Sequence, residues 1–181
     1  MDESKKLIIL DIDGVLIYRT NNNYYANALY ENSLFDKYLF VKENNIHIFT
    51  RKNINIFLNI LFEKYDVAIY TSITNKNLKK IIDFIFIGDQ KKMLKFIWGR
   101  DKTYPDFTST NNFDTIKKLD NIPGNYSENN IIICDDSLKK IRNIPIKNKI
   151  IIQKYSFYYD YNHKEYLIYL LDEIQLKFNN I

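Results

Sequence analysis

The chain has 181 residues, a length typical of one domain that can bury most of its apolar surface. Tyr and Phe are abundant, with 15 and 12 copies, whereas there are only 4 Gly and 3 Pro, which indicates an ordered, element-rich protein. The net charge of +4 is too small to indicate nucleic-acid binding. The single cysteine, Cys134, excludes an internal disulfide, and no Cys/His cluster suggests a structural zinc site.

The amino-terminal region indicates an intracellular protein. The apolar run that begins at Leu7 is cut short by Asp11, so it is too brief for the core of a signal peptide. No stretch approaches the roughly eighteen uncharged apolar residues of a membrane helix. We therefore expect a soluble protein of the cytoplasm or nucleus, not secreted, in which residues 1–181 form a single domain.

Short apolar runs alternate with helical patterns along the chain. Strands are expected at residues 7–10, 66–70, 94–98, 131–134 and 150–152. Amphipathic spacing predicts helices around residues 54–62 and 78–85, more weakly over 113–119, and a closing helix around 167–174. Strands that are apolar on both faces and separated by helices predict a doubly wound α/β domain, with a mostly parallel sheet and helices on both faces.

One segment, about residues 17–51, interrupts this alternation. Two strand-like runs at residues 38–41 and 46–49 flank a polar turn, which predicts a β-hairpin. Because it follows the first strand directly, the hairpin would overhang the carboxyl ends of the strands, where ligands bind in such sheets. We expect a flap of this kind and no large cap domain.

The first strand runs into the segment DIDGVL, which places Asp11 and Asp13 where the strand must end. At such a point the two carboxylates can lie side by side, so that one attacks phosphorus while the other moves a proton. A calcium loop would need an oxygen ligand at its fifth position and Glu at its twelfth, where this chain has Val15 and Asn22. A plain polar turn remains the alternative for this motif alone.

Two other strand ends carry polar side chains. The second strand ends in Thr71 and Ser72, whose hydroxyls could hold phosphate oxygens, although capping of the next helix is the commoner role. The fourth strand ends in Asp135 and Asp136, which could equally form a solvated turn or a helix cap. Together with Asp11 on a neighbouring strand, Asp135 would supply the carboxylates by which proteins hold Mg²⁺.

A lysine upstream of the fourth strand completes the set. An enzyme that forms a phosphoenzyme needs a fixed cation to offset the charge gathered by phosphate and carboxylates. Lys117 and Lys118 are adjacent, and register does not settle which points inward; we favour Lys117. With 26 Lys and Arg in the chain, any single lysine is usually a surface residue, so its position among the other motifs is what supports it.

The order of these motifs resembles the haloacid dehalogenase superfamily: Asp-x-Asp in the segment DIDGVL, then Thr71, Lys117 and the pair Asp135-Asp136. The hairpin between the first two motifs and the stretches TRK at residues 50–52 and YTS at residues 70–72 narrow the likeness. With these features the chain resembles the branch of small CTD and FCP-type phosphatases, also called NLI-interacting-factor-like. The likeness covers about residues 6–175. Val15 departs from the branch, which usually has Thr there.

The resemblance implies a Mg²⁺-dependent phosphomonoesterase that acts through an aspartyl-phosphate. Asp11 would be the nucleophile, and Asp13 the general acid for the leaving group and then the base for the hydrolytic water. Thr71, with Ser72, would bind phosphate oxygens and Lys117 would stabilise charge.

The resemblance also implies a metal site and further substrate contacts. Asp11, the backbone carbonyl of Asp13 and Asp135 would hold Mg²⁺, with Asp136 close by or acting through water. Two arginines, Arg51 and Arg100, match basic positions of the branch only loosely. Arg51 would bind substrate, and a surface or structural role is the equal alternative for both.

Three functions stay open at this point. The first is a protein Ser/Thr phosphatase of the CTD type, whose partner is a phosphoprotein. The second is a phosphatase of nucleotides or polynucleotide ends that uses the same residues. The third is a catalytically silent binding module that keeps the fold to hold a partner. An aromatic run over residues 155–161 could stack on bases, but packing of the last helix against the sheet is the better interpretation.

Overall fold

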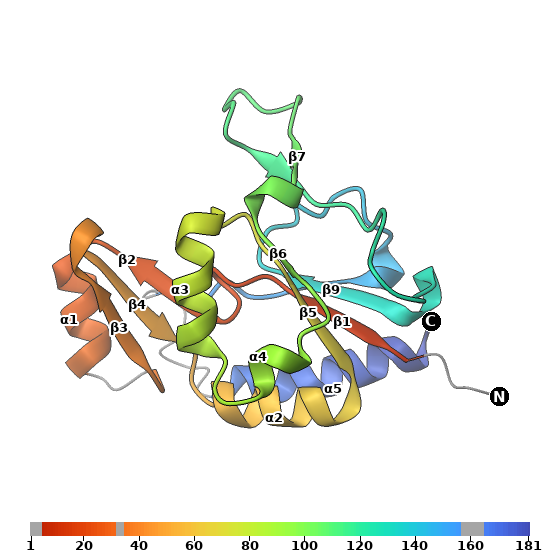
Figure 1. The fold of residues 1–181 in the computed structure, drawn as a ribbon, viewed down its shortest axis with the longest axis horizontal. Helices are drawn as coiled ribbons and strands as arrows, with labels where there is room; N and C mark the ends of the chain where they lie inside the picture. Colours follow the sequence, from red (N-terminus) through yellow and green to blue (C-terminus); the bar gives the residue numbers. More distant parts are fainter. Residues whose placement is uncertain (1–4, 32–34, 157–164) are drawn as a thin grey trace.

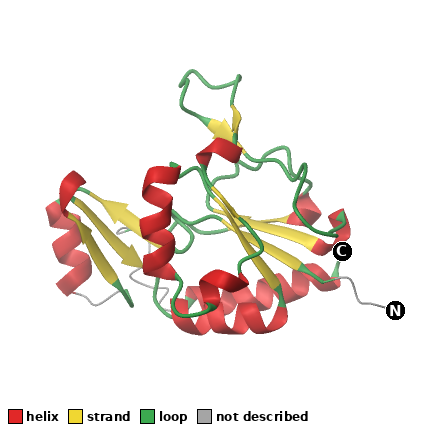
Figure 2. Ribbon diagram, in the orientation of Figure 1, coloured by secondary structure: helices red, strands yellow, loops and turns green. Residues whose placement is uncertain are grey.

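The computed structural model describes residues 5–31, 35–156 and 165–181. Its centre is a five-stranded sheet in the order β10-β9-β1-β5-β6, in which every neighbouring pair is parallel. The strands in this sheet are β1 (Leu7–Leu10), β5 (Asp66–Tyr70), β6 (Ile97–Trp98), β9 (Ile131–Asp135) and β10 (Lys149–Ile151). The expected α/β fold with a mostly parallel sheet is confirmed (Figures 1 and 2).

Long helices cover one face of this sheet. They are α2 (Ile54–Lys64), α3 (Asn75–Ile85) and α5 (Tyr166–Asn179), and α2 and α5 run side by side below the sheet in Figure 1. Their apolar stripes pack on alternate strand residues, such as Ile8 and Leu10 of β1, in one continuous core. A short helix, α4 (Gln90–Met93), follows α3.

Irregular segments cover much of the opposite face. There the other strand residues, such as Leu7 and Ile9, pack against Ile141 and Ile144, which belong to the turns after β9. The segment before β9 adds the partly buried Tyr126, and two 3₁₀ turns, η3 (Glu128–Asn130) and η4 (Ile146–Asn148), border β9 and β10. Helices therefore dominate one face, because the connections around β9 are too short or too polar to form an α-helix.

The flap spans about the residues expected, 17–51, but contains more elements than the predicted hairpin. Its hairpin strands, β3 (Tyr38–Val41) and β4 (Ile46–Thr50), flank the turn η1 (Lys42–Asn44) as expected. A third strand, β2 (Ile17–Thr20), pairs antiparallel with β4, and a helix, α1 (Asn23–Glu31), covers the outer face through Ala26 and Leu29. The inner face joins the main core through residues such as Ile17 and Ile48. The flap is therefore a small two-layer unit, seen at the left of Figure 1.

The weak helix expected over residues 113–119 is wrong. A two-stranded hairpin stands there instead, formed by β7 (Tyr104–Pro105) and β8 (Thr115–Ile116), and its loop projects at the top of Figure 1. The side chain of Phe113, which should have begun the apolar stripe, is exposed, whereas Ile116 is buried and Leu119 packs partly against the core, so the three residues do not form one stripe. A short pair of strands instead carries the chain directly to Lys117.

Smaller differences concern element bounds and the described range. The third strand, β6, has two residues where five were expected, since residues 94–96 lead up to it without strand geometry. Of the aromatic run, Tyr155 is buried, whereas residues 157–161 lie outside the described residues. No helix in the described part of the chain is long and apolar enough to cross a membrane.

Candidate active site

Strand register brings the sequence motifs to one edge of the sheet. Leu10, the last residue of β1, pairs with Cys134 of β9 on one side and with Ile69 of β5 on the other. The residues that follow on these three strands therefore emerge at the same level, which is how Asp11 and Asp135 meet although they are far apart in sequence. This edge is the carboxyl end of a parallel sheet, the usual place of a binding site.

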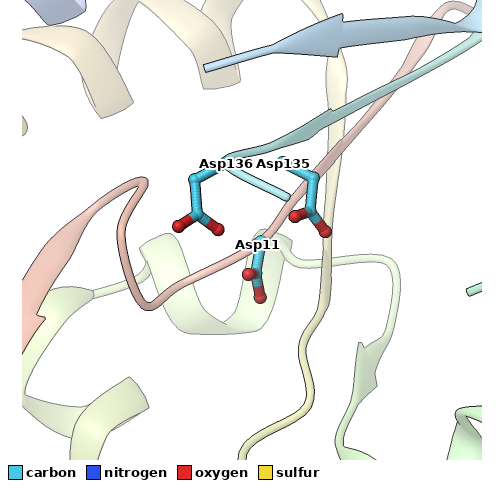
Figure 3. Close-up of side chains that lie close together, drawn as sticks. All are labelled: Asp11, Asp135 and Asp136. Carbon is cyan, nitrogen blue, oxygen red and sulfur yellow. The ribbon is translucent and has the colours of Figure 1, made fainter. Parts of the chain in front are cut away.

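Three carboxylates converge there. Asp11 and Asp135 are fully buried, and Asp136 is partly buried beside them. One carboxylate oxygen from each residue lies within 4.8 Å of the others, and in Figure 3 the three side chains approach one another from two strand ends. The backbone N–H of Ser137 donates to Asp135 Oδ1 at 2.8 Å and fixes that side chain. Since turns rather than an α-helix follow, the acidic pair does not cap a helix.

Lys117, and not Lys118, points into this cluster. Its ammonium is fully buried and lies 2.5 Å from Asp135 Oδ2 and 3.2 Å from Asp11 Oδ1. The backbone helps to place it, because the N–H of Lys117 donates to the carbonyl of Lys140 at 2.8 Å. Lys118 turns the other way, with its ammonium 4.4 Å from the centre of the Tyr104 ring.

The burial of these charges shifts their pKa values. Burial opposes ionisation of Asp11, but Lys117 and then Lys140 outweigh it and lower the pKa of Asp11 below its usual value. Burial also opposes the charge on Lys117, yet the carboxylates of Asp11 and Asp135 raise the pKa of this ammonium. Burial, aided by Asp11, raises the pKa of Asp135 against the opposing effect of Lys117. Asp11 therefore stays ionised, and the cluster holds more negative charge than Lys117 neutralises.

The cluster fits a hard divalent cation such as Mg²⁺. Both carboxylate oxygens of Asp11 are buried and contact the ammonium groups of Lys117 and Lys140, but neither accepts a hydrogen bond of good geometry among the described residues. Burial, with the neighbouring Asp11 and Asp135, raises the pKa of Asp136 to about 6. A bound cation would supply the missing partner and relieve the repulsion, and an all-carboxylate donor set is the kind that Mg²⁺ prefers.

Asp13 stands apart from the buried cluster. Its carboxylate is about 38% exposed and pairs with Arg19 of β2, whose Nη2 lies 2.6 Å from Asp13 Oδ2. The metal contact expected of Asp13 involves its backbone carbonyl, which the pairing of its side chain with Arg19 does not test. That contact therefore stays a prediction. The partial exposure of this side chain lets it exchange protons with a substrate or with water.

Gly14 permits the close approach of the first loop to the second acidic pair. Its backbone has a φ of +86°, which L side chains rarely adopt, and a Cβ there would lie 2.3 Å from Asp136 Oδ2. The carbonyl of Gly14 accepts hydrogen bonds from the N–H of Tyr155 at 2.7 Å and from Arg51 Nη2 at 3.4 Å. The position after Asp13 therefore needs a glycine, because the backbone there passes close to Asp136 at the end of β9.

Arg51 is buried, and it is not exposed as a residue that binds substrate would be. Its side chain is buried between Tyr155 and Tyr166, with the guanidinium carbon 5.1 and 4.3 Å from the two ring centres. Its Nη2 donates to the carbonyl of Gln153 at 2.6 Å as well as to that of Gly14. We interpret Arg51 as a residue that supports the Gly14 loop from behind.

The remaining predicted residues lie at the end of β5 or beyond it. Thr71 is buried beside Asp11, and its hydroxyl accepts the N–H of Ile73 at 3.4 Å; it does not cap α3, which begins after Thr74. Ser72 is partly buried, and its hydroxyl lies 3.4 Å from that of Thr115. Arg100 donates to the carbonyl of Phe113 and so braces the β7–β8 projection.

Sequence reasoning missed two cations of this site. Lys140 Nζ lies 3.9 Å from Asp11 Oδ2 and is about 31% exposed, so it can contact a ligand as well as Asp11. A signal existed, because Lys139 and Lys140 follow the acidic pair closely. Arg19, the partner of Asp13, gave no signal, because it belongs to a strand that the sequence pattern did not predict.

Comparison with known proteins identifies relatives of this arrangement. The chain is 27% identical over 150 residues to an uncharacterised FCP1 homology domain-containing protein of Schizosaccharomyces pombe. The match covers 76% of this chain and 57% of that protein. It thus spans little more than half of this curated relative.

Solved structures show a similar fold. The structure of the fission yeast RNA polymerase II CTD phosphatase Fcp1-R271A bound to beryllium fluoride matches 97% of this chain and 51% of its own, with a TM-score of 0.60 and 18% identity. A second structure of Fcp1, described as an essential RNA polymerase II CTD phosphatase, covers 96% and 51% with the same TM-score and identity. At this identity the likeness concerns the fold.

A family sequence model decides the assignment. The model of the NLI interacting factor-like phosphatases matches residues 6–180, which include every side chain of the site described above. The chain belongs to the NLI interacting factor-like phosphatase family.

Proposed function

We propose that this protein is a Mg²⁺-dependent phosphatase that transfers the phosphoryl group of a monoester to Asp11 and then to water. The observation that carries the proposal is the state of Asp11. Its carboxylate is buried and kept ionised by Lys117 and Lys140, and among the described residues it contacts these ammonium groups without accepting a hydrogen bond of good geometry. Such a group is available both as a nucleophile and as a metal ligand.

The residues that would hold the metal are Asp11, Asp135 and, directly or through water, Asp136, together with the backbone carbonyl of Asp13. When bound, Mg²⁺ supplies positive charge that lets an anionic carboxylate approach an anionic phosphate. The observations that support this assignment are the 4.8 Å clustering of the three carboxylates and the raised pKa values of Asp135 and Asp136.

The side chains divide the work of two successive displacements. In the first, an oxygen of Asp11 attacks phosphorus, the bond from phosphorus to the ester oxygen breaks, and Asp13 gives that oxygen a proton. In the second, Asp13 takes a proton from water as the water oxygen attacks the phosphorus of the aspartyl-phosphate and releases Asp11. Throughout, Lys117 and Lys140 balance the added negative charge, and the Thr71 hydroxyl donates to a phosphate oxygen.

We infer that the substrate is a phosphorylated Ser or Thr of a protein. Family membership supports this assignment, as does the fold shared with Fcp1, which is described as a CTD phosphatase. The site also lies at an open sheet edge beside a small flap, with no large cap among the described residues, which suits an extended peptide.

The first test is hydrolysis of p-nitrophenyl phosphate by the wild type and by Asp11→Asn, with Mg²⁺ and with EDTA. We expect turnover only for the wild type with Mg²⁺. Absence of Mg²⁺-dependent turnover, or turnover that survives the substitution, would overturn the proposal and favour a silent binding module.

The substrate class needs a second comparison. The ratio kcat/KM should be higher for phosphoserine and phosphothreonine peptides than for oligonucleotides with a 3′- or 5′-phosphate, because this ratio measures discrimination between substrates. The reverse order would assign the site to polynucleotide ends.

A further inference from the structure

Arg19 forms an ion pair that joins the flap to the first catalytic loop. Its Nη2 lies 2.6 Å from Asp13 Oδ2, and the two side chains are 27% and 38% exposed. The Nε of Arg19 is buried and has no hydrogen-bond partner among the described residues, so the Asp13 carboxylate is what holds the guanidinium in place. The pair therefore links β2 of the flap to the loop that follows β1.

The backbone aims Arg19 at Asp13. Residues i and i+2 of a strand share a face, so Arg19 points to the same side of β2 as Ile17, which is buried in the main core. The turn between Asp13 and β2 is tightly fixed, since the N–H groups of Leu16 and Ile17 both donate to the carbonyl of Ile12, at 2.8 and 3.1 Å. The flap strand and the acid loop thus keep a fixed relation.

We propose that Arg19 is a positioning residue that holds the carboxylate of Asp13 in the orientation needed for proton transfer to the leaving group. This inference rests on the proposed function and adds the residue that places the acid. A carboxylate with 38% exposure has freedom to rotate, whereas a general acid must lie within hydrogen-bond reach of the oxygen that it protonates. An error of about 1 Å in such a placement costs up to about a hundredfold in rate.

The energetics separate this role from a structural one. Partly exposed ion pairs contribute little to stability, so loss of Arg19 should leave the fold nearly as stable as before. The main effect of losing Arg19 should be a lower kcat/KM for substrates whose leaving group needs a proton from Asp13. Because Arg19 belongs to β2, any shift of the flap would also move Asp13.

The test compares two aryl phosphates that differ in their need for an acid. Nitrophenolate is a good leaving group without protonation, whereas the more basic phenolate depends more strongly on a proton from a general acid. The ratio kcat/KM reports on the step in which this leaving group departs. We expect Arg19→Ala to lower kcat/KM about tenfold to a hundredfold for phenyl phosphate and less than about threefold for p-nitrophenyl phosphate. Arg19→Lys should restore part of the loss, and Lys42→Ala, an exposed cation of the same flap, should change neither value.

A double substitution decides between positioning and substrate binding. In the Asp13→Asn background, adding Arg19→Ala should have little further effect on phenyl phosphate, because the acid that Arg19 places is already gone. An equal loss on both substrates, or an undiminished loss in the Asp13→Asn background, would overturn the inference while an active wild type leaves the proposed function standing. A wild type without Mg²⁺-dependent turnover would overturn the proposed function and this inference with it.

Discussion

The ammonium of Lys117 lies 2.5 Å from Asp135 Oδ2, and both side chains are fully buried. The same ammonium lies 3.2 Å from Asp11 Oδ1, so one lysine offsets negative charge on two carboxylates that come from different strands. A buried cation shared by two carboxylates holds the site together before any ligand arrives, and it leaves one negative charge in excess for a metal or for Lys140 to offset.

Loss of Lys117 should therefore cost both stability and activity. We expect Lys117→Ala to destabilise the metal-free protein by about 3 kcal/mol, because two buried carboxylates lose their counter-ion. Urea unfolding in EDTA measures this loss. Turnover of p-nitrophenyl phosphate should fall at least about a hundredfold.

The adjacent lysine provides the matched control. Lys118 contacts the Tyr104 ring, so Lys118→Ala should change the free energy of unfolding by less than about 1 kcal/mol and leave turnover near the wild-type value. A larger cost at position 118 than at 117 would reverse the assignment of the site lysine.

Asp136 should give the metal-free protein a distinctive pH dependence. Its pKa rises to about 6 in the folded protein, so between the ordinary value of 3.8 and about 6 the folded state binds more protons than the unfolded state. Stability from this group is therefore present at low pH and declines as the pH rises to about 6. In EDTA at pH 7.5, Asp136→Asn should be more stable than the wild type by about 1 kcal/mol, a value discounted because the group is partly exposed.

Urea unfolding at pH 4 and pH 7.5 measures this effect. The advantage of Asp136→Asn should be small at pH 4, and saturating Mg²⁺ should remove it at pH 7.5, since a bound cation favours the carboxylate. A variant that is less stable than the wild type at pH 7.5 in EDTA would show that Asp136 is not strained by its neighbours.

Gly14→Ala should be more harmful than a comparable change elsewhere. Both Gly14 and Gly88 have positive φ, at +86° and +56°, so alanine is strained at either position by about 1 kcal/mol. Of these two positions, Gly14 is the one where the added Cβ collides with another side chain, that of Asp136, whereas the space around Gly88 is open. Thermal unfolding should show a larger loss for Gly14→Ala, accompanied by weaker Mg²⁺ binding in calorimetry; equal effects at both glycines would contradict the packing described here.

Lys140 should contribute to turnover from its place beside the nucleophile. Its ammonium lies 3.9 Å from Asp11 Oδ2, and its exposure lets it contact a phosphate. We expect Lys140→Ala to lower kcat/KM about tenfold. Lys139→Ala is the control, because Lys139 pairs with Asp114 at 2.6 Å, and it should have little effect. Similar losses for both variants would show a general field effect rather than a local contact.

The sheet and its catalytic edge were predictable because they depend on local patterns. Continuous apolar runs indicate buried parallel strands, and a polar residue at the end of each run marks the binding edge, so Asp11, Thr71 and Asp135 could be placed from the sequence. The order of the motifs indicated a site lysine before the fourth strand but did not settle between Lys117 and Lys118, and the structure shows that Lys117 is the buried one.

Features that depend on packing between distant segments could not be predicted. Residues 17–20 are too short to indicate a strand by themselves, and they become one only by pairing with β4, so neither β2 nor the Arg19–Asp13 contact was visible. The burial of Arg51 depends in the same way on two tyrosines about a hundred residues away. The apolar spacing over residues 113–119 misled because Phe113 lies in the exposed loop between β7 and β8, whereas Ile116 and Leu119 contact the core without forming a helix.

The central claim is that Asp11 accepts the phosphoryl group, and acid quenching during turnover tests it most directly. Wild-type protein mixed with p-nitrophenyl phosphate and Mg²⁺, quenched in acid and digested, should yield a phosphorylated peptide whose modification maps to Asp11 and is removed by mild alkali. The Asp11→Asn protein should yield none. A phosphoryl group that maps to another residue, or one that persists in Asp11→Asn, would contradict the account.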